Sequence, residues 1–498
     1  MTESPLADLE PRILWRAFDA LRQVPRPSKK EARAVAFVQD WAFQNGFETK
    51  ADAASNMVVR VPASPGHESA PLVVIQGHLD MVCEKNQGVT HDFDNDPIAV
   101  EVDGDWVRAQ GTTLGADNGI GVAAAMAAAV DPEVVHGPLE LLMTIDEETG
   151  LNGVAKLDPE IVRGRILLNL DSEEEGALYI GCAGSAGNRA FVPVERDAEA
   201  SGELYELAVK GMRGGHSGLD INTGRANALK TLTGVLIGLA EAGLALRLVT
   251  LDGGSARNAI PREAFAVVTP ANGEGANDTS VDDVQKALTD MEAALRERYR
   301  GEPGLTLSLN PAAAFAESAA APAPLTQESA ERLLRLIDAL PHGVLAMSQE
   351  VPDLVETSNN VAVVRTDGSD VYVECTSRSS VYAAQVETAR SVSSACRLAG
   401  ARVEEDRGYP GWAPNPASPL VRRTAAAYEK LFGEPPAIKA IHAGLECGVL
   451  NEKLPGLDAI SFGPDLEGAH SPDERVSIAS VARFYQLLSR VLADLTTS

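Results

Sequence analysis

The sequence of 498 residues is poor in cysteine, and its few cysteines are neither paired nor clustered. They are Cys83, Cys182, Cys375, Cys396 and Cys447. Their odd number and the lack of any CxxC spacing argue against a disulfide scaffold and against a thiolate zinc site. Such cysteine usage is typical of proteins from a reducing compartment.

Long apolar runs are also missing, because no stretch reaches the roughly 18–20 residues that a membrane-spanning helix needs. Residues 1–22 mix acidic, basic and apolar side chains. They lack the basic and apolar regions of a signal peptide. We therefore expect a cytoplasmic location and no membrane partner.

Basic residues are scarce relative to acidic ones, with 43 Lys and Arg against 71 Asp and Glu and a net charge of −28. Because phosphate binding requires a basic face, we do not expect a nucleic-acid partner. Most surface carboxylates serve solubility, but a cluster of them can hold cations. Composition does not separate these two uses, so the positions of the acids must.

The apolar pattern predicts a first domain of the α/β class, with a mostly parallel sheet flanked by helices. Helical spacing is found at 9–23 and 30–45, and Ser28 with Glu31 matches a capping box. Short apolar runs lie at 72–75, 139–145 and 166–170, with an alanine-rich helix expected at 119–129. Strands that alternate with helices favour a parallel sheet. Each apolar run ends in polar residues, and ligands of such sheets bind beyond the carboxyl ends of the strands.

The middle of the chain predicts a second, inserted domain of the α+β type. Helices are expected at about 225–242, 280–299 and 326–340, an Ala/Pro-rich connector at 311–325, and strands at 361–364 and 370–375. Residues suited to metal binding reappear only after this segment, near 467–470. We therefore expect the first domain to resume beyond it.

The polar residues of the first domain offer ligands for two divalent metal ions. They are His78, Asp80, Asp117, Glu147, Glu148, Asp171 and His470. Taken singly, each has an ordinary explanation, such as a surface histidine, a helix N-cap or an acidic turn. Taken together, two histidines and three carboxylates suit zinc, with manganese or cobalt as alternatives. Two further acids remain for supporting roles.

Seven segments form an ordered set of motifs over nearly the whole chain. They are GHLDMVCEKN (77–86), GTTLGADNGIGVAAAMA (111–127), DEETGLNG (146–153), LNLDSEEEG (168–176), GGHSGLDI (214–221), HAGLECG (442–448) and GAHSPDERV (468–476). With these motifs the chain resembles the M20 metallopeptidases. It is most similar to their aminoacyl-histidine dipeptidase (Xaa-His dipeptidase, carnosinase-like) branch. The resemblance implies a zinc-peptidase-like catalytic domain at 1–187 and 402–498, with an inserted lid at 188–401.

The same resemblance assigns roles to the residues of the metal site. His78 and His470 would each bind one metal ion, and Asp117 would bridge the two. Glu148 and Asp171 would complete the ligand set, one for each ion. Glu147 is expected to be the general base that deprotonates the water between the ions, and Asp80 the acid that orients His78.

The resemblance also implies that the lid contributes to the site. His216 would stabilise the oxyanion, within one chain or across a homodimer. Asn258 and Arg378 would contact the substrate, and the Arg378 guanidinium suits the free carboxyl end of a peptide. Glu446 is a candidate for the substrate's amino group or an ordinary loop acid, and Cys447 has no assigned role.

The expected activity is hydrolysis of dipeptides, of the Xaa-His type or broader. An N-acyl-amino-acid deacylase or an aminotripeptidase on the same scaffold stays an alternative. A binding protein without catalysis is disfavoured, because every ligand and base position carries a competent residue.

Overall fold

The computed structural model describes residues 4–197, 203–244, 246–270, 279–312 and 322–497. The chain divides into two compact units, unit 1 (Met1–Cys182 and Trp412–Ser498) and unit 2 (Ala183–Gly411). Strand β9 (Gly184–Pro193) pairs with β19 (Arg402–Tyr409), so that both strands belong to unit 2. The boundaries therefore lie at 182/183 and 411/412, where the sequence predicts 187/188 and 401/402.

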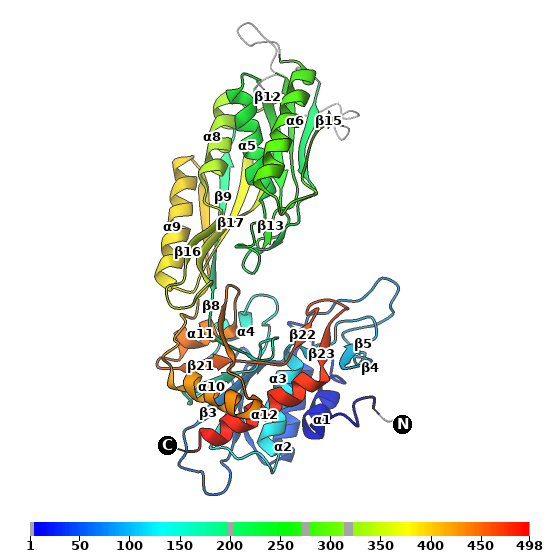
Figure 1. Ribbon diagram of the computed structural model, residues 1–498, viewed down its shortest axis with the longest axis vertical. Helices are drawn as coiled ribbons and strands as arrows, with labels where there is room; N and C mark the ends of the chain where they lie inside the picture. Colours follow the sequence, from blue (N-terminus) through cyan, green and yellow to red (C-terminus); the bar gives the residue numbers. More distant parts are fainter. Residues whose placement is uncertain (1–3, 198–202, 245, 271–278, 313–321, 498) are drawn as a thin grey trace. The chain divides into compact units, whose positions relative to one another are not determined.

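Unit 1 is built on an eight-stranded sheet with the order β1-β2-β6-β3-β7-β21-β8-β20 (Figure 1). Its strands are β1 (Glu48–Ala51), β2 (Met57–Val61), β3 (Val73–His78), β6 (Leu139–Thr144), β7 (Ile166–Asn169), β8 (Ala177–Cys182), β20 (Ala437–Ile441) and β21 (Asp458–Ser461). Four neighbouring pairs are parallel, namely β6–β3, β3–β7, β7–β21 and β8–β20. The predicted α/β architecture with a mostly parallel sheet is confirmed.

The central strands are level at their carboxyl ends. His78 of β3 lies opposite Thr144 of β6, and Gln76 lies opposite Asn169 of β7. Both β3 and β6 are buried along their whole length. Because such strands are covered on both faces, they are continuous apolar runs, which is why the sequence shows them clearly.

The helices of unit 1 are α1 (Arg12–Leu21), α2 (Ala32–Gln44), α3 (Ala116–Val130), α4 (Asn152–Ala155), α10 (Pro419–Phe432), α11 (Glu446–Lys453) and α12 (Ile478–Asp494). Helix α3 is almost wholly buried and packs on β3, α1 and α12. Its many alanine and glycine residues permit this close packing. The expected helix at 119–129 lies within α3.

The predicted capping box before α2 does not form. The helix begins after Glu31, and neither side chain caps its backbone. Ser28 instead donates a hydrogen bond to Asp80, 2.8 Å away, and Glu31 accepts one from the amide of Asp146 at 3.0 Å. Both side chains therefore support the loops at the ends of β3 and β6.

A small sheet in unit 1, with the order β22-β23-β5-β4, holds the last predicted ligand segment. Its strands are β4 (Val100–Asp103), β5 (Trp106–Ala109), β22 (Leu466–Glu467) and β23 (Arg475–Ser477). His470 lies in the loop between β22 and β23, with a positive φ of 63°.

Unit 2 has its own sheet and its own apolar core. The sheet has the order β15-β10-β14-β12-β17-β18-β9-β19, and β16 pairs with β17. These strands are β10 (Tyr205–Lys210), β12 (Leu246–Gly253), β14 (Ala264–Pro270), β15 (Thr306–Pro311), β16 (Gly343–Met347), β17 (Val355–Asp367) and β18 (Asp370–Ser379), together with β9 and β19. A two-stranded sheet pairs β11 (Gly215–His216) with β13 (Ala259–Ile260).

Three of the four helices described in unit 2 are predicted from the sequence. The described helices are α5 (Ala228–Glu241), α6 (Val281–Arg298), α8 (Gln327–Ala339) and α9 (Tyr382–Leu398). The first three coincide with predicted helices, whereas α9 is not predicted. Most of the expected connector at 311–325 lies outside the described residues. Among the described residues of both units, none of the helices combines the length and apolarity needed to cross a membrane.

Candidate metal centre

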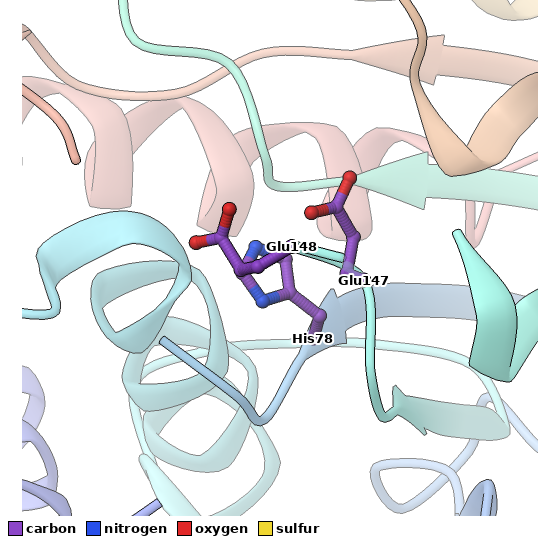
Figure 2. Close-up of side chains that lie close together, drawn as sticks. All are labelled: His78, Glu147 and Glu148. Carbon is purple, nitrogen blue, oxygen red and sulfur yellow. The ribbon is translucent and has the colours of Figure 1, made fainter. Parts of the chain in front are cut away.

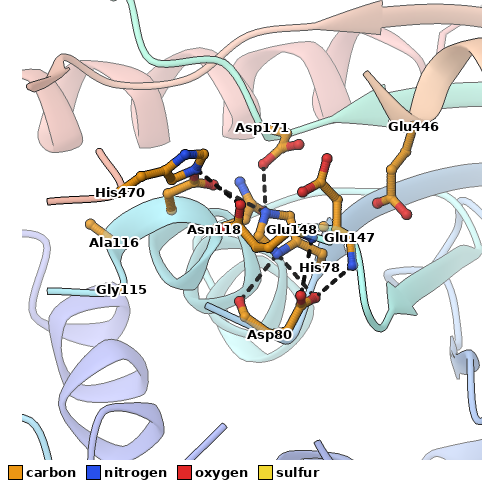
Figure 3. A network of polar contacts seen from close by, with 12 residues as sticks. His78, Asp80, Gly115, Ala116, Asn118, Glu147, Glu148, Asp171, Glu446 and His470 are labelled. Carbon is orange, nitrogen blue, oxygen red and sulfur yellow. Dashed lines mark hydrogen bonds and ion pairs between the residues drawn. The ribbon is translucent and has the colours of Figure 1, made fainter. Parts of the chain in front are cut away.

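The predicted metal ligands of unit 1 meet where its central strands end (Figure 3). His78 is the last residue of β3, Glu147 and Glu148 follow β6, and Asp171 follows β7. Asp117 lies in the first turn of α3, and His470 comes from the β22–β23 loop. Five segments that are distant in the sequence thus contribute to one cluster.

Asp117 lies between the two histidines. Its Oδ1 is 3.0 Å from Nε2 of His78, and its Oδ2 is 3.2 Å from Nε2 of His470. Each histidine faces a second carboxylate, because His78 Nε2 lies 3.3 Å from Asp171 Oδ1 and His470 Nε2 lies 2.9 Å from Glu148 Oε2. The Asp117 carboxylate thus lies between two pairs of side chains, His78 with Asp171 and His470 with Glu148.

The donor atoms fit divalent ions. One group that could hold a metal ion consists of His78, Asp117 and Asp171, and another of Asp117, Glu148 and His470, with the ligand atoms of each group within 4.8 Å of one another. The two groups share Asp117. In addition, Oε1 of Glu148 is buried and accepts no hydrogen bond from the described residues. A buried carboxylate oxygen without a partner is costly, and a cation would satisfy it.

Neighbouring acids shift the pKa values of both histidines of this cluster upward. Hydrogen bonds to Asp117 and Glu148 raise the pKa of His470 to about 11. Burial opposes the charged form of His78, but the neighbouring Asp171 and Asp117 outweigh it and raise its pKa well above the ordinary value. Burial also raises the pKa of Asp171 to about 6.

Asp80 is fully buried and holds several segments of the site together. Its Oδ1 lies 3.5 Å from Nδ1 of His78, and its two oxygens accept hydrogen bonds from the amides of Glu147 and Glu148 at 3.1 and 3.2 Å. Burial raises its pKa, but the bond to His78 and the amide bonds outweigh burial, so that the pKa is lowered to about 2. Asp80 is therefore ionised and can orient both His78 and the Glu147–Glu148 turn.

Glu147 lies beside the ligands His78 and Glu148 (Figure 2). It forms a third candidate group with His78 and Glu148. The two groups that share Asp117 already contain all five predicted ligands, so Glu147 is not required as a metal ligand. Burial raises its pKa well above the ordinary value, and Asp171 and Glu148 add to this effect. A carboxyl group of this kind suits proton transfer.

Glu446 is the first residue of α11, is fully buried and stands near Glu147 (Figure 3). Its Oε2 accepts hydrogen bonds from Gln76 at 2.5 Å and from Thr144 at 2.6 Å. Its Oε1 is buried without a partner among the described residues. Burial raises the pKa of Glu446 to about 8. This residue is not an ordinary loop acid.

Two supporting residues of unit 1 are missed by the sequence analysis. Glu474 accepts four backbone hydrogen bonds around Asp117, and Arg26 donates to three backbone carbonyls of the neighbouring loops. Glu474 lies inside the GAHSPDERV motif, which is the signal that could have singled it out. Arg26 carries no comparable signal, because a lone arginine between two prolines resembles a surface residue.

In unit 2, His216 and Arg378 lie side by side. Nδ1 of His216 accepts the amides of Gly218 and Leu219 at 3.2 and 3.0 Å, so the ring proton belongs on Nε2. Burial, aided by the charge of Arg378, lowers the pKa of His216 to about 4. The ring is therefore neutral near pH 7 and presents an N–H donor.

The guanidinium of Arg378 is buried and has only neutral partners among the described residues. It donates to Ser217 at 3.2 Å and to Tyr409 at 3.4 Å, and it lies 3.5 Å from Nε2 of His216. The third predicted residue of this unit, Asn258, is exposed. Its backbone carbonyl accepts a hydrogen bond from the amide of Ser217 at 2.8 Å.

Comparison with known proteins defines the class to which this fold and site belong. Residues 74–494 match the model of Peptidase family M20/M25/M40, so the chain belongs to that family and is a peptidase. The family consists of dinuclear metal-dependent peptidases, and the groups around Asp117 are candidate metal sites. The predicted family resemblance is confirmed.

Individual relatives place the chain more narrowly. It is 41% identical over 495 residues, 99% of each chain, to the cytosol non-specific dipeptidase of Escherichia coli (strain K12). It is also similar to the crystal structure of the aminoacylhistidine dipeptidase from Vibrio alginolyticus, with 40% identity over 98% of both chains and a TM-score of 0.86. A tripeptidase from Staphylococcus aureus shares the fold at 14% identity, with a TM-score of 0.56 over 98% of this chain and 100% of the other.

Proposed function

We propose that the protein is a cytosolic dipeptidase that hydrolyses small peptides with a free amino and a free carboxyl end, using two divalent metal ions. The observation that carries this proposal is the position of Asp117, whose two oxygens face His78 and His470. The identity of 41% to a cytosol dipeptidase over almost the full length supports the substrate class and the location.

The proposed ligands of one ion are His78, Asp117 and Asp171, and those of the other are Asp117, Glu148 and His470. This mix of imidazole and carboxylate donors favours zinc, while manganese and cobalt accept the same donors. When bound, such ions polarise the scissile carbonyl group and lower the pKa of a water molecule.

The residues of this chain would then carry the proton and charge transfers. Glu147 takes a proton from the attacking water and returns it to the leaving amine, as its place beside the ligands allows. Asp80 keeps His78 in its orientation. His216 offers the N–H on its Nε2 to the oxyanion, since its Nδ1 is occupied as an acceptor.

Two charged side chains suit the two ends of a dipeptide. The unpartnered Oε1 of Glu446 is a buried acceptor suited to a substrate ammonium group. Arg378 offers a buried guanidinium with no acidic partner among the described residues, which suits a carboxylate. We propose Asn258 as a further substrate contact, because its side chain is exposed. If Glu446 binds a free amine in this way, an N-acyl amino acid would lack that contact, because an acylated substrate has no ammonium group.

The test is hydrolysis by the purified protein loaded with zinc, manganese or cobalt, and by the same protein with a chelator. The substrates are β-Ala-His, several Xaa-His and Xaa-Leu dipeptides, a tripeptide and an N-acetyl amino acid. We expect cleavage of dipeptides, loss of cleavage on chelation and recovery on addition of metal. Cleavage of the N-acetyl amino acid alone would identify a deacylase, and preference for the tripeptide an aminotripeptidase. Two bound ions without any amide hydrolysis would indicate a binding protein. The homodimer stays a prediction that sedimentation of the purified chain tests.

A further inference from the structure

The carboxylate of Glu474 is enclosed by the backbone that leads into α3. It is 2% exposed and accepts four amide hydrogen bonds. One oxygen accepts the amides of Leu114 and Gly115 at 2.7 and 2.9 Å. The other accepts those of Ala116 and Asp117 at 2.7 and 3.2 Å. Each amide of this turn, including that of Asp117 itself, is thus directed at one side chain.

Glu474 also belongs to the segment that carries His470. It lies between His470 and β23, and its own amide donates to Ser471 at 3.1 Å. The carboxylate therefore ties the loop of one proposed ligand to the loop of another, although these loops are far apart in the sequence. This contact uses only backbone amides and none of the side chains of the proposed metal ligands.

Arg26 also binds the same turn, through the carbonyl of Gly115. Its guanidinium is 2% exposed, donates to the carbonyls of Leu79 and Asp80 at 3.0 Å each and also donates to the carbonyl of Gly115. A Cβ atom at Gly115 would lie 2.6 Å from Nη2 of Arg26, and one at Gly119 would lie 2.7 Å from it. The glycines of the GADNG segment thus make room for a cation that joins the Asp117 turn to the loop after β3.

We propose that Glu474, together with Arg26, is a positioning residue that sets the place of Asp117 in the proposed two-metal site and the distance from Asp117 to His470. The inference rests on the proposed two-metal site. Among the described residues, the hydrogen bonds of the Glu474 carboxylate all come from backbone amides, so Glu474 acts through the backbone of the turn. The ion held by Asp117, Glu148 and His470 depends on both segments that Glu474 joins, and its affinity should be the more sensitive of the two.

The experiment compares Glu474→Gln, Glu474→Asp and a matched control, Glu140→Gln, in the full chain. Glu140 of β6 is 1% exposed and accepts the amides of Arg163 and Gly164 at 2.8 and 3.1 Å. It lies near the amino end of its strand, away from the ligands. The probe is Co²⁺, which is added to metal-free protein while binding heat and visible absorption are recorded. Thermal unfolding of the metal-free proteins is measured in parallel.

Both Gln variants should lower the unfolding temperature, because each replaces a buried acceptor of backbone amides. Only Glu474→Gln should also lower the binding affinity of one of the two Co²⁺ ions, by roughly 10- to 100-fold, which is the usual effect of removing a group that orients metal ligands. It should also alter the visible absorption of that ion. Glu474→Asp, which keeps the charge, should recover part of both. If Glu474→Gln does not fold, Glu474→Asp carries the same readouts with a smaller shift.

Wild-type affinities and an unchanged spectrum in the folded Glu474 variants would overturn the inference, as would an equal loss in Glu140→Gln. Binding of two Co²⁺ ions by the wild-type protein tests the proposed site separately. An unaltered variant together with a two-ion wild type would therefore reject the role of Glu474 and leave the proposed function standing. A wild type that binds no Co²⁺ would reject both.

Discussion

Loading the metal-free protein with divalent ions should release protons. Without bound metal, hydrogen bonds to Asp117 and Glu148 raise the pKa of His470 to about 11, so this ring is protonated at pH 7.5. The neighbouring Asp171 and Asp117 shift the pKa of His78 in the same direction. A histidine must be neutral at the nitrogen that binds a metal ion. The ion bound by His470 therefore displaces one proton from that ring. The upward shifts of the pKa values of His78 and Glu147 act in the same direction and add to the release.

The same reasoning fixes the direction and size of the pH dependence. A displaced proton competes with the metal at every pH below the histidine's pKa in the metal-free protein. The affinity of the ion bound by His470 should therefore rise about tenfold for every pH unit between pH 6.5 and 8.5. For His470 the rise should continue across this whole range, because its pKa of about 11 lies above it.

Calorimetry measures this release directly. Co²⁺ or Mn²⁺ is titrated into metal-free protein in buffers that differ in ionisation enthalpy and bind metals weakly, and the slope of heat against that enthalpy gives the number of protons. We expect at least one for the wild type and one fewer for His470→Ala. The control His67→Ala, in the loop between β2 and β3, should match the wild type. No proton release and a flat pH dependence would refute the assignment of His470 as a ligand.

Three substitutions test the remaining roles. Glu147→Gln should reduce kcat by roughly 10²- to 10⁴-fold, the usual contribution of a general base, while both ions stay bound, and substantial turnover would contradict this role. Arg378→Ala should raise KM for free dipeptides roughly 10- to 100-fold, since hydrogen bonds to a charged group contribute about 1.5–3 kcal/mol. C-terminally amidated substrates should be unaffected, as should all substrates in the exposed control Arg397→Ala, and an equal loss on amides would count against the contact. Glu446→Gln should lower kcat/KM for dipeptides about tenfold or more, the order expected when a charge-assisted contact is lost. Its activity on N-acetylated substrates should not change, and a parallel loss there would assign Glu446 to structure.

The strands and the ligand positions of unit 1 can be predicted from the sequence for a physical reason. Strands β3 and β6 are covered on both faces, so they are apolar runs that end abruptly at His78 and before Glu147. A parallel sheet brings such ends together, so the chain order of the polar clusters also predicts their meeting in space. The roles of these residues rest on the family resemblance and await the tests above.

Other features depend on contacts that no local pattern shows. Ser28 and Glu31 have the spacing of a capping box, but tertiary contacts with Asp80 and Asp146 use both side chains. Likewise, nothing near Gln76 or Thr144 indicates that both bind Glu446, since these residues meet only when the sheet has formed. Helix α9 was missed because its apolar positions are interspersed with serine and alanine.

The place of β21 in the sheet affects the order in which the protein can be assembled. Strands β7 and β8 are consecutive in the chain, yet β21 lies between them, and it is synthesised only after all of unit 2. In a nascent chain that has produced residues 1–182, β7 therefore lacks its neighbour β21, β8 lacks both β21 and β20, and His470 is absent. Unit 2, with its own core, can fold during this interval, whereas the first half of unit 1 must wait. Acquisition of the full metal complement would then be among the last events of biogenesis, and a chain cut short before residue 458 could not be rescued by added metal.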